Sequence, residues 1–144
     1  MQIPFQFFPF SQVFGQGNCP TQKKRGGETY MKLLTEEIKA KIPALYSQEN
    51  KKDPMVICKF FDPVGSWTWF VTEGEENGDG DFEFFGLVIG FEAELGYFTL
   101  SQLETAKQGI TGIKALPIER DLYFTPCKLS EAKKQYMIEH GKEI

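Results

Sequence analysis

The clearest pattern in the chain is a pair of short segments near its middle that are rich in apolar residues. Residues 54–61 (PMVICKFF) have the β-branched and aromatic composition of a strand. Residues 66–72 (SWTWFVT) alternate, so that Trp67 and Trp69 share one side of an extended chain. The sequence DPVG at 62–65, which joins the two segments, is typical of a tight turn. The pattern predicts two strands paired as an antiparallel hairpin.

Three more segments have the same composition and are predicted to be strands: 82–91, 95–98 and 122–126. The first of them is apolar on both faces, as expected for a strand inside a sheet. Its glycines, Gly86 and Gly90, indicate a bulge, a bend or a close approach of another backbone. The acidic residues 73–83 are predicted to form a loop, because they include several glycines and no basic residue.

Three short helices are indicated by capping residues and by glycines that can end a helix. The first two begin at a threonine whose hydroxyl can accept a bond from a free amide of the first turn. Acidic residues in the first turn are favoured by the helix dipole. The first helix is expected to begin at Thr35, with Glu36 and Glu37 in its first turn. The second is expected to begin at Thr99, with Gln102 completing its cap, and to end at Gly109. The third is expected over residues 130–140 and to end at Gly141.

This order of elements predicts one α+β domain over residues 31–144, with an antiparallel meander of about four to five strands and about three short helices. A chain of 144 residues is long enough for a single core of this size. Residues 1–30 differ, because Pro4 and Pro9 interrupt a Phe-rich run and oppose a helix. We expect an irregular tail there, with Met31 as the natural beginning of the domain. A tail that docks on a partner or joins copies of the chain is the alternative.

Charge and rare residue types exclude several classes of function. The net charge is −4, and the acids concentrate in residues 73–83, which is opposite to the charge of a surface that binds phosphates. His140 is the only histidine, which nearly excludes catalysis by a Ser-His-Asp triad or a Cys-His pair. Cys19, Cys58 and Cys127 are too scattered for a disulfide scaffold. No run approaches the ~20 apolar residues of a membrane span, and we expect no membrane partner.

One candidate metal loop fails a direct test. Asn77, Asp79 and Asp81 alternate as the ligands of a calcium-binding EF-hand loop do. The glycine and the glutamate that the motif requires further along are Phe82 and Val88 here. A solvated turn is therefore the better interpretation, and no metal site is predicted.

Carboxylates are the remaining candidates for catalysis. Glu73, Glu94, Glu119 and Asp121 lie at predicted strand ends or loops, where functional residues tend to gather. If they converge, they could hold Mg²⁺ for phosphodiester hydrolysis. The interpretation that we favour is structural: Arg120 clamps the loop before the last strand to the sheet. Because Glu119 and Asp121 point away from Arg120 in an extended chain, we predict that Arg120 pairs with Glu73 or Glu94.

The tryptophan pair also allows two interpretations. Aromatic rings on a sheet can stack against single-stranded bases, which would make Trp67 and Trp69 a binding platform. Burial in the core is more common for such side chains, because it contributes strongly to the stability of a small domain. We favour the core.

Four segments of the chain together resemble the bacterial family called domain of unknown function 2958: 33–50, 59–75, 84–104 and 116–126. The resemblance implies a short cytoplasmic protein encoded on plasmids and conjugative transposons, beside genes for DNA transfer, replication and anti-restriction. It implies no catalytic residue, because the family has no established activity. The matched positions that merit inspection are Trp67, Trp69, Glu73, Glu94, Gly96, Tyr97, Glu119, Arg120 and Asp121.

The leading hypothesis is a non-enzymatic accessory protein of a mobile genetic element that needs no cofactor. It would bind a protein or single-stranded nucleic acid during DNA transfer or defence evasion, with Trp67, Trp69 and Tyr97 as candidate binding residues. The alternative is a metal-dependent nuclease that cleaves single-stranded DNA. In that case the four carboxylates would hold Mg²⁺ or act as the base, and Arg120 would bind phosphate.

Overall fold

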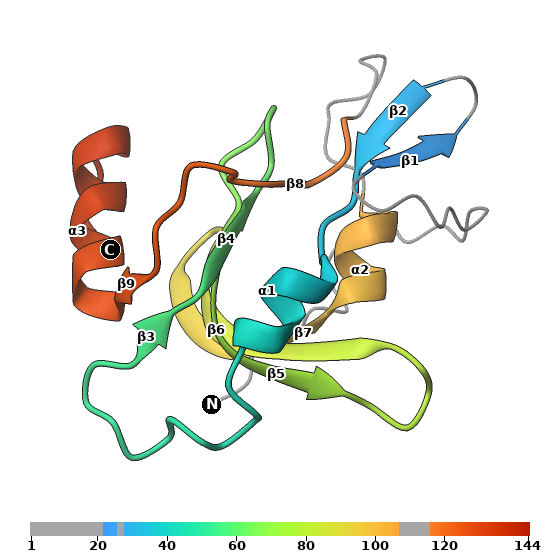
Figure 1. Cartoon of the computed structure of the whole chain (residues 1–144). Helices are drawn as coiled ribbons and strands as arrows, with labels where there is room; N and C mark the ends of the chain where they lie inside the picture. The colour runs from blue at the N-terminus through green and yellow to red at the C-terminus, as the bar shows by residue number, and fades with distance from the viewer. Residues whose placement is uncertain (1–21, 26–27, 107–115) are drawn as a thin grey trace.

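The computed structural model describes residues 22–25, 28–106 and 116–144, and its centre is a five-stranded sheet (Figure 1). The strands lie in the order β7-β6-β5-β4-β8, and each neighbouring pair is antiparallel. This arrangement confirms the predicted α+β fold and its antiparallel meander. The strands are β4 (Cys58–Phe61), β5 (Thr68–Glu76), β6 (Phe82–Ile89), β7 (Ala93–Thr99) and β8 (Glu119–Arg120).

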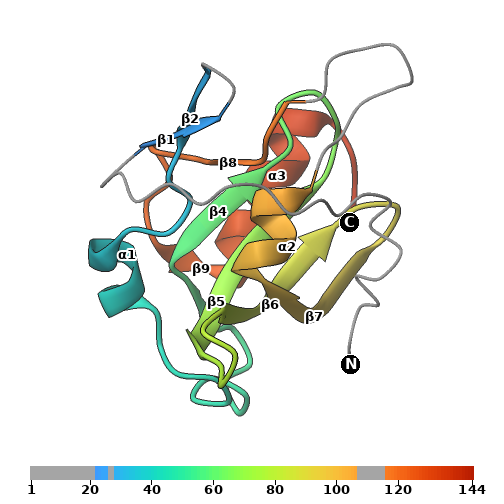
Figure 2. The same cartoon turned by 90° about the vertical axis from the view of Figure 1, so that its right-hand side faces the viewer.

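Helices cover both faces of the sheet (Figure 2). On one face lie α1 (Glu36–Lys41) and α2 (Leu100–Thr105), and on the other lies α3 (Leu129–His140). A short antiparallel pair, β3 (Met55–Val56) with β9 (Cys127–Lys128), joins the start of α3 to the strand region. In the described part of the chain, no helix has both the length and the apolar character that crossing a membrane requires.

Part of the segment expected to be an irregular tail is paired. β1 (Gln22–Arg25) and β2 (Glu28–Met31) form a separate two-stranded antiparallel sheet, an element that the sequence pattern did not predict. The Phe-rich run itself falls in residues 1–21, outside the described residues.

The capping residues act as predicted. Thr35 Oγ1 accepts a hydrogen bond of 3.3 Å from the amide three residues later, at the start of α1. Thr99 and Gln102 make both bonds of a capping box at the start of α2. Gly141 ends α3 with a φ of 60°, a left-handed conformation that favours glycine. Gly109, expected to end the second helix, lies outside the described residues.

The alternation along the strands divides the core into two parts. Trp69, Phe60 and Phe84 are buried on the side of α1 and α2. Phe70 is buried on the opposite side, where its ring packs edge-on against Tyr136 of α3. Both faces of the sheet are therefore apolar, as the sequence of β6 predicted for an interior strand.

The prediction of a loop over residues 73–83 is wrong for its first part. β5 continues to Glu76, and residues 77–81 alone form the turn before β6. In this turn the Asn77 side chain accepts bonds from two backbone amides, at 3.0 and 3.1 Å. The strand extends into the acidic stretch because Glu73 is buried and its carboxylate is satisfied by backbone amides of another loop.

The predicted strand at 122–126 is also wrong. Asp121 Oδ1 accepts a 2.9 Å bond from the Tyr123 amide, and its carbonyl oxygen accepts a 3.4 Å bond from the Phe124 amide. Such local bonds give the backbone an alternative to sheet pairing, so β8 ends before this segment. The strand predicted at 54–61 is split in two, β3 and β4, which pair with different strands.

Candidate functional site

The carboxylates proposed as metal ligands do not meet. Glu94 lies in β7, at one edge of the sheet. Glu119 lies in β8, at the opposite edge, and Asp121 is the first residue after β8. Glu73 lies in β5 between these edges. Among the residues that the structure describes, no group of three or more acidic, histidine or cysteine side chains could hold a metal ion.

Glu73 instead anchors the loop that follows α1. Its Oε1 accepts a 3.0 Å bond from the Tyr46 amide, and its Oε2 accepts a 2.5 Å bond from the Gln48 amide. The buried Gln48 side chain continues the network, because its Nε2 donates to the carbonyl oxygens of Thr72 and Met55 at 2.7 and 3.0 Å. A buried carboxylate satisfied in this way stabilises the fold.

Arg120 does not pair with Glu73 or Glu94, and that prediction is wrong. Its Nη1 donates to the carbonyl oxygens of Lys32 and Leu33, at 2.8 and 2.5 Å. The guanidinium is largely buried on the side of α1, opposite to Asp121, as the alternation along an extended chain predicted. The clamp therefore ties β8 to the segment before α1 through backbone carbonyls.

Replacing Arg120 with alanine is expected to lower the free energy of unfolding by about 1–3 kcal/mol, because it removes the donor that these carbonyl oxygens share. Urea unfolding followed by circular dichroism measures the change, with Lys142→Ala as a surface control that removes the same charge. A fully stable Arg120→Ala protein that had lost Mg²⁺-dependent cleavage of single-stranded DNA would contradict the structural role.

The aromatic candidates lie in different surroundings. Trp69 is 0% exposed, in agreement with the favoured core interpretation, and half-buried Trp67 lies beside it with ring centroids 5.9 Å apart. Tyr97 lies in the edge strand β7 and is half-buried. Its ring is 4.8 Å from that of Phe85 and 6.4 Å from that of Tyr46. The ring of Tyr97 is thus near the surface, whereas that of Trp69 is not.

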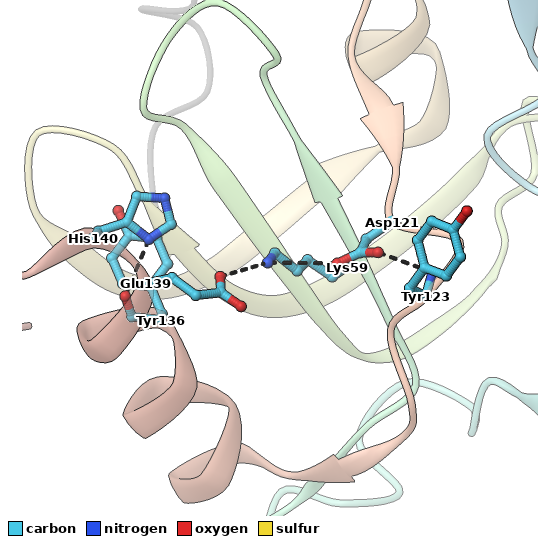
Figure 3. Close-up of polar contacts among 6 residues, drawn as sticks. All are labelled: Lys59, Asp121, Tyr123, Tyr136, Glu139 and His140. Carbon is cyan, nitrogen blue, oxygen red and sulfur yellow. Dashed lines mark hydrogen bonds and ion pairs between the residues drawn. The ribbon is translucent and has the colours of Figure 1, made fainter.

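The structure forms a cleft where β4 and the residues after β8 face the C-terminal part of α3. At its centre Lys59 Nζ lies 3.6 Å from Asp121 Oδ2 and 3.4 Å from Glu139 Oε2 (Figure 3). The lysine side chain is 12% exposed, and its Nζ lies 5.9 Å from the centre of the Phe70 ring. Two cavities of about 280 and 260 Å³ share Lys59, Asp121 and Glu139 as lining residues. We call this region the Lys59 cleft.

The two sides of the Lys59 cleft differ in character. On α3, the ring of His140 stacks on that of Tyr136 with centroids 4.0 Å apart, and its Nδ1 lies 3.0 Å from the Tyr136 carbonyl oxygen (Figure 3). On the other side, the turn after Asp121 exposes 62% of Leu122 and 94% of Tyr123. Large apolar side chains this exposed, beside a cavity, are typical of an interaction site.

The chemistry of the cleft suits recognition. It offers two carboxylates, one ammonium group and aromatic carbon, and Lys59 is paired with both Asp121 and Glu139. Asp62 lines the smaller cavity, and burial raises the pKa of its carboxyl group. The thiol of Cys58 is inert, because burial in the core on the opposite face of the sheet raises its pKa to about 12.

Sequence reasoning missed Lys59 and Glu139, although it selected Asp121. Lys59 was detectable as the single charged residue inside an apolar strand, a position that requires either a partner or an exposed site. Glu139 gave no such signal, because it is one of several charges on a polar helix and lies 80 residues from its partner.

Comparison with known proteins agrees with the resemblance seen in the sequence. Residues 33–136 match the model of the family described as "Protein of unknown function (DUF2958)". A search of the curated proteins gave no match, and a search of the solved structures gave none either. The matched range contains all five strands of the central sheet. The chain therefore belongs to the DUF2958 family of proteins of unknown function.

Proposed function

We propose that this protein is a non-enzymatic accessory protein of a mobile genetic element, and that it acts in the cytoplasm during DNA transfer or defence evasion. It binds a protein partner through the Lys59 cleft. The genetic context rests on the family resemblance, and the binding role rests on the cleft.

The observation that carries the binding role is a pair of exposed apolar side chains beside a cavity whose charged groups are paired with one another. Lys59 is paired with both Asp121 and Glu139, which leaves one excess negative charge among the three groups. Leu122 and Tyr123 stand beside it in solvent. Exposed aromatic side chains are enriched at protein interfaces, where they act as anchors for a partner.

A protein partner fits this surface better than a nucleic acid does. The carboxylates of Asp121 and Glu139 would repel phosphates, and Lys59, the cation between them, is already paired with both. The nuclease alternative requires converging carboxylates, and its four candidates lie in β5 and at the two opposite edges of the sheet.

The test is copurification from the native host with the tagged full-length chain. Replacing both Leu122 and Tyr123 with serine is expected to abolish recovery of a partner that wild type retains, because the rim loses its apolar contacts. Ile138→Ser is the matched control: Ile138 is an exposed apolar residue of α3 that does not line either cavity. It is expected to recover the partner normally.

Two results would contradict the proposal. One is equal recovery of the same partners by the doubly substituted protein and wild type. The other is Mg²⁺-dependent cleavage of single-stranded DNA by wild type that Asp121→Asn removes, which would favour the nuclease.

A further inference from the structure

A second surface, on the opposite edge of the sheet from the Lys59 cleft, combines one exposed and two half-buried rings with carboxylates. Tyr97 of β7 lies directly opposite Phe85 of β6, and their ring centroids are 4.8 Å apart. Phe85 in turn lies opposite Glu73 of β5, so one row of the sheet carries two rings and an acid on the same face. In the next row, Glu83 lies opposite another glutamate of β5.

Tyr46 completes this surface from outside the sheet. Its ring centroid is 6.4 Å from that of Tyr97, and its side chain is 60% exposed. The backbone of Tyr46 has a φ of 69°, a left-handed conformation that is costly for a bulky residue. The amides of Leu45, Tyr46 and Gln48 donate to the carboxylates of two β5 glutamates, which hold the loop in place. These hydrogen bonds between loop amides and glutamates therefore fix the position of the exposed Tyr46 ring.

The charges near these rings are negative. The hydrogen bond with the Tyr46 side chain, burial and the charges of Glu73 and Glu83 together raise the pKa of Tyr97 to about 12. Glu75 and Glu83 lie directly opposite each other in β5 and β6, a like-charge pair that is unfavourable without a nearby cation. Among the residues that the structure describes, lysines lie over the rings of Phe82 and Phe70, but none lies over Tyr46, Phe85 or Tyr97.

We infer that Tyr46, Phe85 and Tyr97, with Glu75 and Glu83 beside them, form a docking surface for an arginine or lysine side chain of a basic protein segment. The negative faces of the rings attract a cation, and the carboxylates neutralise it. A nucleic acid strand is disfavoured, because the same carboxylates repel its phosphates. The inference deepens the proposed binding function by stating the chemistry of one partner segment, and it uses residues separate from the Lys59 cleft.

The test uses a fluorescein-labelled peptide of Arg-Gly-Ser repeats and measures its binding to the full chain by fluorescence anisotropy. Wild type is expected to bind it, and a peptide with citrulline in place of arginine is expected not to bind. Tyr97→Leu is expected to weaken binding by about fivefold, which is the scale of one cation–π contact. Glu83→Gln is expected to weaken it by about threefold, and more strongly at low salt.

Tyr46→Asn is the variant that separates binding from folding. Asparagine tolerates the left-handed conformation, so the loop is expected to keep its stability while the ring is lost. We expect an unchanged melting temperature and about fivefold weaker peptide binding. Glu37→Gln, which removes an exposed acid of α1 on the other face of the sheet, is the charge-matched control and is expected to bind as wild type does.

Five results would overturn the inference. Two concern the variants of this surface: unchanged peptide binding by Tyr46→Asn and Tyr97→Leu, and equal weakening by Glu37→Gln and Glu83→Gln. Two concern the ligand: equal binding of the citrulline peptide, and displacement of the arginine peptide by oligothymidine. The fifth is loss of peptide binding in the Leu122 and Tyr123 serine variant. Failure of the cleft experiment alone leaves these measurements unaffected, so the two proposals fail separately.

Discussion

Replacing Trp69 with alanine is expected to lower the free energy of unfolding by about 3–5 kcal/mol, the cost of deleting a large buried aromatic side chain. Trp69 is fully buried in the core beneath α1 and α2. It lies between Phe60 of β4 and Val88 of β6 in the sheet register, so the cavity left behind would open at the centre of three strands. Chemical denaturation followed by far-ultraviolet circular dichroism measures the loss without using tryptophan fluorescence.

Trp67→Ala is the matched control for this experiment. Trp67 lies two residues earlier on the same side but is half-buried, and it packs edge-on against the exposed ring of Phe91. We expect Trp67→Ala to lower the free energy of unfolding by about 1–2 kcal/mol, between the values typical of surface and core substitutions. If Trp69→Ala unfolded as wild type does and bound single-stranded DNA more weakly, its assignment to the core would be wrong.

Replacing Gly86 with alanine is expected to destabilise the protein by about 3 kcal/mol, a large effect for the addition of one methyl group. A Cβ at this position would lie 1.8 Å from the carbonyl oxygen of Phe70 in the neighbouring strand. That oxygen belongs to the backbone of β5, just before the bulge between Val71 and Glu73, and it cannot move without breaking the pairing of β5 and β6. Thermal and chemical unfolding both measure the change.

Gly78→Ala tests whether this effect belongs to the site or to glycine in general. Gly78 lies in the turn before β6, where a Cβ would meet no atom within 4 Å. We expect a change within about 0.5 kcal/mol, as for other surface substitutions. Equal stabilities of the Gly86 and Gly78 variants would show that the two strands can separate enough to accept a side chain.

Local patterns in the sequence predicted most of the elements. The threonine caps at 35 and 99 are recognisable because the bonds that they make reach only three residues along the chain. The alternation around Trp69 is visible because the two faces of a strand repeat every second residue. A glycine inside an otherwise apolar strand indicated a bulge, a bend or a close approach at Gly86, and the structure shows the close approach.

Errors arose where a specific hydrogen bond overrode the residue pattern, in two cases to a distant part of the chain and in one case within a turn. The acids at 73–76 belong to a strand because loop amides, 25 and 27 residues earlier in the chain, bind the carboxylate of Glu73. The apolar segment at 122–126 is not a strand because Asp121 redirects its backbone into a turn. Arg120 donates to the backbone carbonyl oxygens of Lys32 and Leu33. Every residue has a carbonyl oxygen, so the amino-acid types do not indicate which one will be the partner.

The fold class, the helix caps, the two-faced sheet and the resemblance to a family are visible in the amino-acid sequence, because they depend on the order and periodicity of residues. Which side chains meet at a surface is visible only in the folded chain. Glu139 reaches Lys59 across 80 residues, and Tyr46 reaches Tyr97 because a loop is held over the sheet by Glu73. The energy of such contacts depends on distance in space, which a linear pattern does not contain.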